Sequence, residues 1–272
     1  MLAQRVVSIV ILAPLVLIVV YLGGFWYLVL VAAGMLVGIQ EFYSLLQRAG
    51  HRPLWPFGLL FAFALIIDSG TPLLPTVRLQ PGEIAFPALA FTILLSLGYL
   101  ITRRELKGSL VDWSLTWAPP LYIGVLLTYL ISLRFLPEGD KWVYLLLGVT
   151  WSTDIAAYVT GRLIGKRRFF PHISPRKTVE GAAGGVLAGV LAGALLAWFF
   201  GWDVSRLMVL ALIGAIAAEA GDLAESLIKR QLHAKDASQL IPGHGGMLDR
   251  LDSLLFVGVI VYYWAIWFGG KV

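Results

Sequence analysis

Long apolar segments alternate with short polar ones along the whole chain. Nine of these segments approach the roughly 20 residues that an α-helix needs to cross the hydrocarbon core of a membrane. They lie at 6–22, 25–39, 55–68, 84–101, 117–133, 142–160, 179–200, 205–223 and 254–269. The pattern predicts an all-α, polytopic integral membrane protein with about nine transmembrane helices, of which the third and eighth are short or polar at one end.

Composition indicates the same class. Of the 272 residues, 59% are hydrophobic and 14% are charged, and the mean hydropathy is +0.83. The absence of cysteine excludes disulfides, thiolate zinc sites and a cysteine nucleophile. No Gly-x-x-x-x-Gly-Lys-Ser/Thr occurs, so a P-loop nucleotide site is excluded as well.

The net charge of +5 is unevenly distributed across the predicted membrane. If all nine segments cross it, 16 of the 21 lysines and arginines fall on the side of the N-terminus. The other five are Arg78, Arg134, Lys141, Arg206 and Lys271. Because cytoplasmic loops carry the excess of basic residues, we expect an inner (plasma) membrane protein whose N-terminus and larger polar loops are cytoplasmic.

The nine segments form a first part, 1–140, with five predicted spans, and a second part, 141–272, with four. The first part contains little chemistry and is interpreted as scaffold and lipid access. Arg5 before an apolar run is typical of a cleavable signal peptide, but no small-x-small cleavage site follows, so we expect a retained helix. Glu41 is interpreted as the polar end of the second span.

One basic cluster in the first part has two interpretations. It either signals topology or attracts an anionic lipid head group. The cluster consists of Arg103, Arg104 and Lys107.

The most polar window extends from Ser226 to Asp252. Asp249 and Asp252 are spaced i, i+3 and would share one face of a helix. The preceding residues 242–246, Pro-Gly-His-Gly-Gly, cannot form regular helix, so they predict a tight turn and a helix that begins near Met247. Such a helix start suits a phosphate, although an acid in its first turn is also ordinary capping chemistry.

The end of the eighth segment adds polar residues on neighbouring helix faces. These residues are Asp222, Ser226, Lys229 and Arg230. Carboxylates suit a hard metal ion, whereas cations and amides suit phosphate, so the combination predicts phosphoryl or nucleotidyl transfer. A solvated loop between two spans is the alternative. Glu219 and Glu225 are interpreted as solvated helix-end residues.

An acid also lies within the sixth segment. Asp154 and Tyr158 are spaced i, i+4 and share a face. An ionisable group at membrane depth is expensive, which makes Asp154 a functional candidate. The alternative is a purely structural partner for Arg162 or another base.

The polar stretch 161–181 is strongly basic. Its cations either anchor the chain at the membrane surface or form a funnel for anions. They are Arg162, Lys166, Arg167, Arg168, Arg176 and Lys177. Small residues then repeat through the seventh segment and predict close helix packing. They are Gly181, Gly184, Gly185, Gly189 and Gly193.

The window from Ser226 to Asp252 resembles the signature of the phosphatidate cytidylyltransferases, also called CDP-diacylglycerol synthases. Its pattern is S-x-x-K-R-x-x-x-x-K-D-x-S-x-x-x-P-x-H-G-G-x-x-D-R-x-D. The blocks 154–165 and 174–181 are similar to further landmarks of that family. The resemblance therefore covers roughly residues 150 to 255. Before residue 150 it is weaker and lies mainly in the hydropathy pattern.

The resemblance implies transfer of CMP from CTP to phosphatidic acid, with release of pyrophosphate and formation of CDP-diacylglycerol. It further implies a Mg²⁺ cofactor, with a second cation left open, contact with membrane lipids, no nucleic acid, and a homodimer. Phosphatidate is already ionised near neutral pH, so no general base is required and His244 is expected to position rather than deprotonate.

Site residues follow from the charge pattern and the resemblance together. The residues assigned to the metal are Asp249, Asp252, Asp222 and Asp154. The residues assigned to catalysis are Asp249, Asp252, Asp222, Lys229, Arg230, Ser226 and His244. The residues assigned to substrate binding are Lys177, Arg176, Ser174, Arg250, Lys235, Gly245, Gly246, Lys166 and Tyr158.

Two other functions fit parts of the sequence. A transporter would explain an intramembrane acid and glycine-interrupted helices, but the two halves show no repeat. A CTP-dependent kinase acting on a polyprenol-type lipid would use similar residues. The products separate the two enzymes, because a kinase leaves CDP and a phosphorylated lipid.

Overall fold

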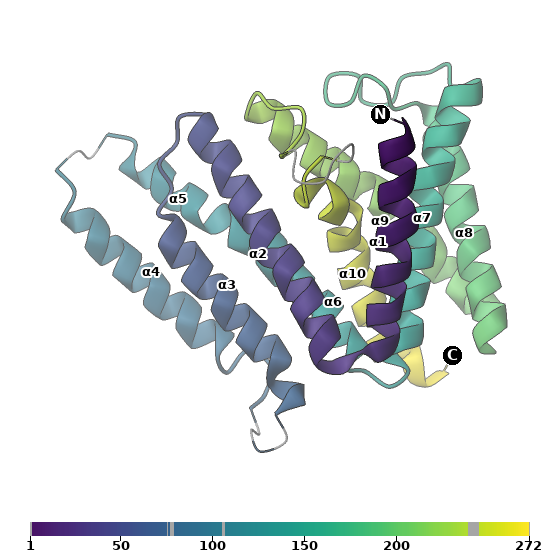
Figure 1. Cartoon of the computed structure of the whole chain (residues 1–272), viewed down its shortest axis with the longest axis horizontal. Helices are drawn as coiled ribbons and strands as arrows, with labels where there is room; N and C mark the ends of the chain where they lie inside the picture. The colour runs from purple at the N-terminus through teal and green to yellow at the C-terminus, as the bar shows by residue number, and fades with distance from the viewer. Residues whose placement is uncertain (1, 75, 77–78, 105–106, 239–244, 272) are drawn as a thin grey trace. The chain divides into compact units, whose positions relative to one another are not determined.

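The computed structural model describes residues 2–74, 76, 79–104, 107–238 and 245–271, with the backbone alone in residues 2–11 and 271. Most of the described chain is helical (Figure 1). Its α-helices are α1 (Leu2–Leu22), α2 (Gly24–Arg48), α3 (Trp55–Gly70), α4 (Ala85–Ile101), α5 (Ser109–Pro119), α6 (Leu126–Arg134), α7 (Gly139–Ile164), α8 (Val179–Phe200), α9 (Val204–Gln231) and α10 (Leu248–Phe268).

Three short turns of other helix types complete these elements. They are two 3₁₀ turns, Thr71–Leu73 and Gly269–Lys271, and a π-helical turn, Pro120–Val125. The π turn joins α5 to α6 and begins at Pro120, which follows Pro119, the last residue of α5. Proline has no amide hydrogen for the i to i−4 bond, so adjacent prolines favour such a local widening.

Seven helical segments in the described chain are long and apolar enough to cross a membrane. They are Gly24–Arg48, Trp55–Leu73, Ser109–Arg134, Gly139–Ile164, Val179–Phe200, Val204–Gln231 and Leu248–Phe268. Two shorter apolar helices, Leu12–Leu22 and Ala85–Ile101, correspond to the first and fourth predicted segments. The all-α, polytopic membrane fold is thus confirmed, whereas the count of nine spans stays a prediction.

Several helices are longer than the apolar segments that predict them. The fifth span begins at Ser109 instead of 117, and the last begins at Leu248 instead of 254. In both places the first turns carry charged residues, Asp112 in one and Asp249 with Asp252 in the other. A hydropathy pattern counts such turns as loop, although their backbone is helical.

The chain forms two compact units. The first consists of Met1–Phe135 with Leu232–Leu248, and the second of Leu136–Gln231 with Asp249–Val272. The division of the sequence at residue 140 separates predicted spans by function and stays a prediction.

In the first unit, buried tyrosines connect α2 to α5 and α6. The Tyr27 hydroxyl donates to the Leu130 carbonyl at 3.0 Å, and the Tyr43 hydroxyl donates to the Thr116 carbonyl at 2.5 Å. A hydrophobic core cluster lies beside them and contains Phe61, Leu65, Ala85 and Trp117. These contacts hold α2 along the rest of the unit.

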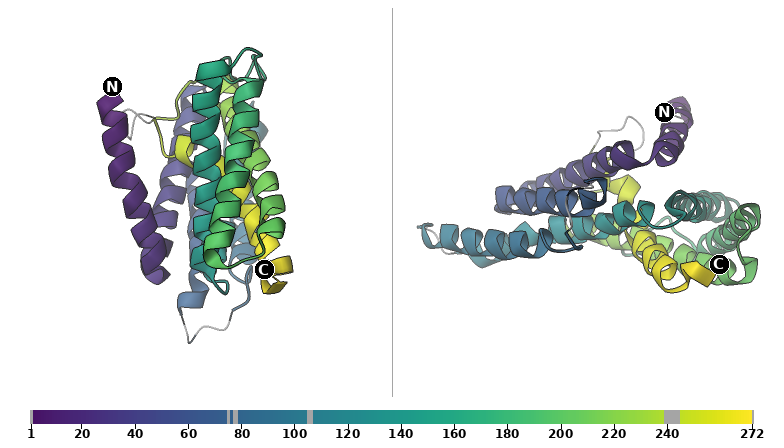
Figure 2. Two further views of the ribbon diagram at one scale, coloured as in Figure 1. Left: turned by 90° about the vertical axis from the view of Figure 1, so that its right-hand side faces the viewer. Right: turned by 90° about the horizontal axis from the view of Figure 1, so that it is seen from below.

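In the second unit, α7, α8 and α9 lie side by side (Figure 2). The glycines buried along one face of α8 recur every four residues, at Gly181, Gly185, Gly189 and Gly193. A Cβ atom at Gly185 would lie 2.8 Å from the Thr153 carbonyl oxygen of α7, and one at Gly181 would lie 2.8 Å from the Ala157 carbonyl oxygen. The prediction of close helix packing from these small residues is confirmed.

Helix α9 approaches α10 in the same way. A Cβ atom at Gly221 would lie 2.5 Å from the carbonyl oxygen of Asp252. Only glycine, which has no Cβ atom, lets the backbones of α9 and α10 come this close. The two helices that carry three of the four predicted metal ligands, Asp222, Asp249 and Asp252, therefore meet at Asp252.

The glycine face of α8 gives a first prediction. Gly185→Ala should destabilise the protein by about 1–3 kcal/mol, because the new methyl group overlaps the backbone of α7. The matched control is Gly98→Ala in α4, where nothing lies within 4 Å of the position that the new methyl group would occupy. Thermal unfolding in detergent should show a lower Tm for the first variant only; equal Tm values would contradict the packing.

Candidate active site

The C-terminal half of α9 gathers acids and bases on one face. Spacings of three and four residues bring them into line along the helix. The residues are Glu219, Asp222, Glu225, Ser226 and Lys229. Glu219 is 8% exposed and Glu225 only 1% exposed, so the interpretation of both as solvated helix-end residues is wrong. Buried charges need partners, and lysines supply them.

Lys177 comes from the loop between α7 and α8 and joins two of these acids. Its ammonium nitrogen lies 2.9 Å from Glu219 Oε2 and 3.0 Å from Asp222 Oδ2. Burial alone would lower the pKa of Lys177, but the negative charges of Asp222 and Glu219 outweigh it and raise this pKa above its ordinary value. Lys177 is therefore a permanent cation at the acidic face of α9.

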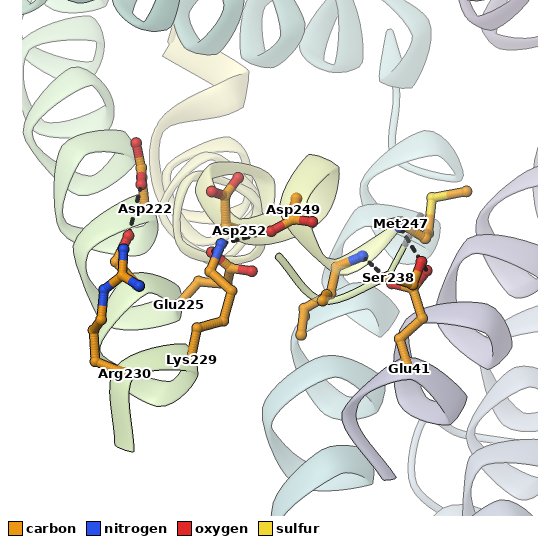
Figure 3. Close-up of polar contacts among 12 residues, drawn as sticks. Glu41, Asp222, Glu225, Lys229, Arg230, Ser238, Met247, Asp249 and Asp252 are labelled. Atoms are coloured by element: carbon orange, nitrogen blue, oxygen red, sulfur yellow. Dashed lines mark hydrogen bonds and ion pairs between the residues drawn. The ribbon is translucent and has the colours of Figure 1, made fainter. Parts of the chain in front are cut away.

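Lys229 makes a second bridge, one helix turn from Glu225. Its ammonium group forms a short ion pair with Glu225, and it donates to Asp249 Oδ1 of α10 at 2.5 Å (Figure 3). All three side chains are nearly or fully buried. Lys229 thus fixes the side chain of Asp249 against α9.

Three carboxylates of this unit repel one another. Asp154 of α7, Asp222 of α9 and Asp252 of α10 lie close enough for mutual electrostatic interaction. Serines also contact two of them: Ser226 donates to Asp222 at 3.4 Å, and Ser253 donates from its hydroxyl to Asp154 at 3.5 Å. Like charges so arranged favour a cation among them.

No group of three or more acids or histidines in the described chain converges as a closed metal shell. A cage built from protein alone is not what magnesium usually requires. It commonly binds through one or two carboxylates and completes its octahedron with water and substrate phosphates. One or two carboxylates among Asp154, Asp222 and Asp252 would be enough for that second arrangement.

The loop that presents Lys177 is held by its own hydrogen bonds. Thr178 caps α8 by accepting from the Gly181 amide at 3.1 Å, and the Glu180 carboxylate accepts from the amides of Lys166 and Arg167 at 3.0 and 3.1 Å. The Phe169 amide also donates to the Lys177 carbonyl at 2.9 Å. The sequence motif around Lys177 therefore builds the loop as well as supplying the cation.

Other predicted site residues lie at the edge of this arrangement. Arg230 Nε donates to the Ile173 carbonyl at 3.3 Å and joins the end of α9 to the same loop. The Tyr158 hydroxyl accepts from Arg162 at 3.2 Å, whereas Asp154 contacts Ser253, so the alternative ion pair between Asp154 and Arg162 does not form. The predicted phosphate-binding residues whose side chains are exposed or half-buried are Lys166, Ser174, Arg176 and Arg250.

The middle of the signature belongs to the first unit. Lys235 is exposed there, Gly245 has a positive φ of 82°, and Gly246 is buried. The turn expected at this position is thus consistent with the left-handed backbone at Gly245. His244 lies outside the described residues. The helix expected near Met247 is confirmed, since α10 begins at Leu248.

The sequence interpretation missed three acids, namely Glu41, Glu219 and Glu225. Each lies in a largely apolar helix, and that placement is itself a signal, because charged groups at membrane depth are rarely incidental. The i, i+4 spacing of Glu225 and Lys229 is a second signal. The partners of Glu41 and Glu219 are distant in the sequence, so spacing does not reveal them.

Comparisons with known proteins agree over nearly the whole chain. A model of the cytidylyltransferase family matches residues 3–268. The phosphatidate cytidylyltransferase of Bacillus subtilis is 31% identical over 263 residues, which cover 96% of each chain. That of Synechocystis is 30% identical over 292 aligned positions, covering 97% of this chain and 96% of the relative, and that of Brucella suis is 34% identical over 270, covering 96% and 92%.

These matches confirm the resemblance inferred from the signature and extend it to the N-terminal helices. Both the family model and the relatives cover the acids and lysines of α9 and α10. The chain therefore belongs to the cytidylyltransferase family, a family of nucleotidyl-transferring enzymes.

Proposed function

We propose that the protein transfers CMP from CTP to phosphatidic acid and forms CDP-diacylglycerol and pyrophosphate. The observation that carries this proposal is the match along nearly the full length to relatives named phosphatidate cytidylyltransferase. The cluster of acids and buried lysines in α9, α10 and the Lys177 loop supports it, because such a cluster suits chemistry between phosphates.

The reaction joins two phosphate groups. A phosphate oxygen of phosphatidic acid attacks the α-phosphorus of CTP, a new P–O bond forms, and the bond from that phosphorus to the oxygen of the β-phosphate breaks. The electron pair of the broken bond leaves with pyrophosphate. Because the attacking oxygen is already ionised near neutral pH, no side chain has to remove a proton, and the barrier is mainly repulsion between anions.

The side chains of the second unit would reduce this repulsion by fixed charge. Lys177 and Lys229 hold the carboxylates of Asp222 and Asp249 in defined positions, at 3.0 and 2.5 Å. Preorganised charges of this kind need no rearrangement when the reaction begins. The exposed cations Arg176 and Arg250 are proposed to attract the triphosphate and the lipid head group.

Magnesium is proposed as the cofactor. Asp222, Asp249 and Asp252 would hold it, with Asp154 as a further member of the acidic group. When bound there, Mg²⁺ neutralises phosphate charge and acts as a Lewis acid toward the phosphoryl oxygens. The mutual repulsion of Asp154, Asp222 and Asp252 supports a cation at this place.

We further propose that the protein resides in the plasma membrane of a bacterium with its N-terminus and polar loops in the cytoplasm, where CTP is available. The relatives are bacterial proteins, and the chain has seven helices of spanning length in its described part. The distribution of lysine and arginine supports the orientation.

The products of the reaction test the proposed function. Purified protein is incubated with phosphatidic acid, Mg²⁺ and CTP labelled either at the α- or at the γ-phosphorus. We expect the α-label in the lipid and the γ-label in pyrophosphate, in equal amounts. A γ-labelled lipid obtained with an alcohol acceptor would instead indicate a lipid kinase, and solute flux in vesicles without any labelled lipid would indicate a transporter.

Asp252→Asn tests the acidic cluster. We expect kcat to fall by about 10²- to 10³-fold, as when one preorganised polar group is removed from a transition-state site. The Tm should not fall, because the substitution removes a charge that Asp222 and Asp154 repel. Steady-state kinetics and thermal unfolding of the same preparation measure both.

The matched control is Asp203→Asn, directly before the first residue of α9 and at the opposite end of that helix from Asp222. Asp203 caps that helix by accepting from the amides of Ser205 and Arg206 at 2.9 and 3.2 Å, and asparagine caps equally well. Its kcat should stay within about twofold of the original enzyme. A loss of activity in both variants, or in neither, would contradict the assignment of Asp252.

A further inference from the structure

Glu41 is a buried acid in a helix that the reaction does not otherwise use. It lies in α2 of the first unit and is only 7% exposed. An isolated carboxylate in such surroundings would be strongly destabilising unless hydrogen bonds satisfied it. The identity of its hydrogen-bond donors therefore indicates what Glu41 is for.

In the described part of the chain, the hydrogen-bond donors to Glu41 come from the signature segment. The Ser238 hydroxyl donates to Oε1 at 2.5 Å, and the Met247 amide donates to the same oxygen at 3.0 Å. The Leu248 amide donates to Oε2 at 2.8 Å. Figure 3 shows Glu41 beside Ser238 and Met247. One carboxylate thus binds residues that precede and follow the sequence Pro-Gly-His-Gly-Gly at 242–246.

The two amides have a special position. Leu248 is the first residue of α10, and the first amides of a helix have no carbonyl partner within the helix. A carboxylate placed there satisfies them and interacts favourably with the positive end of the helix dipole. Glu41 therefore caps α10 from a different helix, about 200 residues earlier in the sequence.

Gly246 lies in close contact with this carboxylate. A Cβ atom at Gly246 would lie 2.5 Å from Glu41 Oε2 and 2.8 Å from its Cδ. Real contacts of this kind do not occur, so any larger residue would displace the carboxylate or the turn. The second glycine of the His-Gly-Gly sequence is thus required by the approach of Glu41.

A second residue of α2 contacts the same segment. Arg48 lies seven residues after Glu41, so the two side chains share a face of the helix. Arg48 Nη2 donates to the Ala237 carbonyl at 2.9 Å, directly before Ser238. This face of α2 therefore binds the signature segment with a carboxylate and a guanidinium.

We propose that Glu41 is a positioning residue for the transfer reaction. It fixes Gly246, Met247 and the start of α10, and Asp249 follows Leu248 directly in that helix, with Asp252 one turn further. The place and rotation of both carboxylates depend on where the helix begins. This inference rests on the proposed function for its kinetic consequence, whereas the anchoring of α10 does not depend on it.

Glu41→Gln tests the anchor, because the amide nitrogen cannot accept a hydrogen bond and one donor loses its acceptor. We expect kcat for CMP transfer to fall by about 10- to 100-fold, as for a small displacement of reacting groups, with KM for CTP nearly unchanged. We also expect amide hydrogens of residues 245–252 to exchange faster, by about tenfold or more, in hydrogen–deuterium exchange. The matched control is Glu83→Gln, an exposed acid, which should alter neither.

Two further variants keep the test decisive if Glu41→Gln folds poorly. Gly246→Ala should reproduce both effects, and Ser238→Ala, which leaves the helix amides bound, should cause a much smaller loss of kcat. Combining Gly246→Ala with Glu41→Gln should add little to either alone, since both break the same contact.

The outcomes separate the two proposals. Faster exchange at 245–252 together with reduced kcat supports the positioning role. Unchanged exchange, or an unchanged kcat per folded molecule despite a lower Tm, overturns it. If the original protein makes no CDP-diacylglycerol at all, the proposed function fails, while the exchange measurement still decides whether Glu41 holds the start of α10.

Discussion

Carboxylates collected at the ends of membrane helices repel one another, and the second unit depends on how this repulsion is balanced. Asp154, Asp222 and Asp252 interact unfavourably, and two buried lysines, Lys177 and Lys229, bind the neighbouring acids. Burying so many charges is costly unless each is paired. Pairing with lysines fixes the positions of these carboxylates before any phosphate binds. We propose that this acidic group binds Mg²⁺ and both substrates.

The rest of the second unit brings these charges together. Glycines of α8 allow its backbone to touch α7, and Gly221 allows α9 to touch α10 at Asp252. Helices at ordinary separation would hold the same carboxylates farther apart. The hydrogen bonds of Thr178 and Glu180 then give the loop the shape that presents Lys177. Backbone packing and charge placement are therefore one design, in which small residues determine electrostatic distances.

Hydropathy was sufficient to predict the helices. A segment that crosses a membrane must be long and apolar, and its backbone groups must form their hydrogen bonds without water, which a helix achieves. It could not predict the true starts of α5 and α10, since charged first turns resemble loops in such a profile. The glycine spacing in α8 predicted close packing correctly, because residues without side chains on one helix face allow a neighbouring backbone to approach. The signature acids and Lys177 were found through their residue types and the family resemblance.

The partners of these residues were less accessible. Lys177 pairs with Glu219 across 42 positions, and Glu41 binds Leu248 across 207. No local spacing connects such residues, so Glu41 and Glu219 were interpreted as polar helix ends. A buried acid in an apolar helix was nevertheless a reason to expect a distant partner.

Metal binding is the sharpest test of whether the acidic group and the phosphates share an ion. Mn²⁺ binding to the purified protein is followed by electron paramagnetic resonance, with and without a CTP analogue that has a methylene group between the α- and β-phosphorus. We expect the analogue to tighten Mn²⁺ binding by about tenfold or more, because carboxylates and phosphates share the ion. An Asp222→Asn, Asp252→Asn double variant should lose this effect. Equal Mn²⁺ affinity in the double variant and the original protein would contradict a metal site built from these carboxylates.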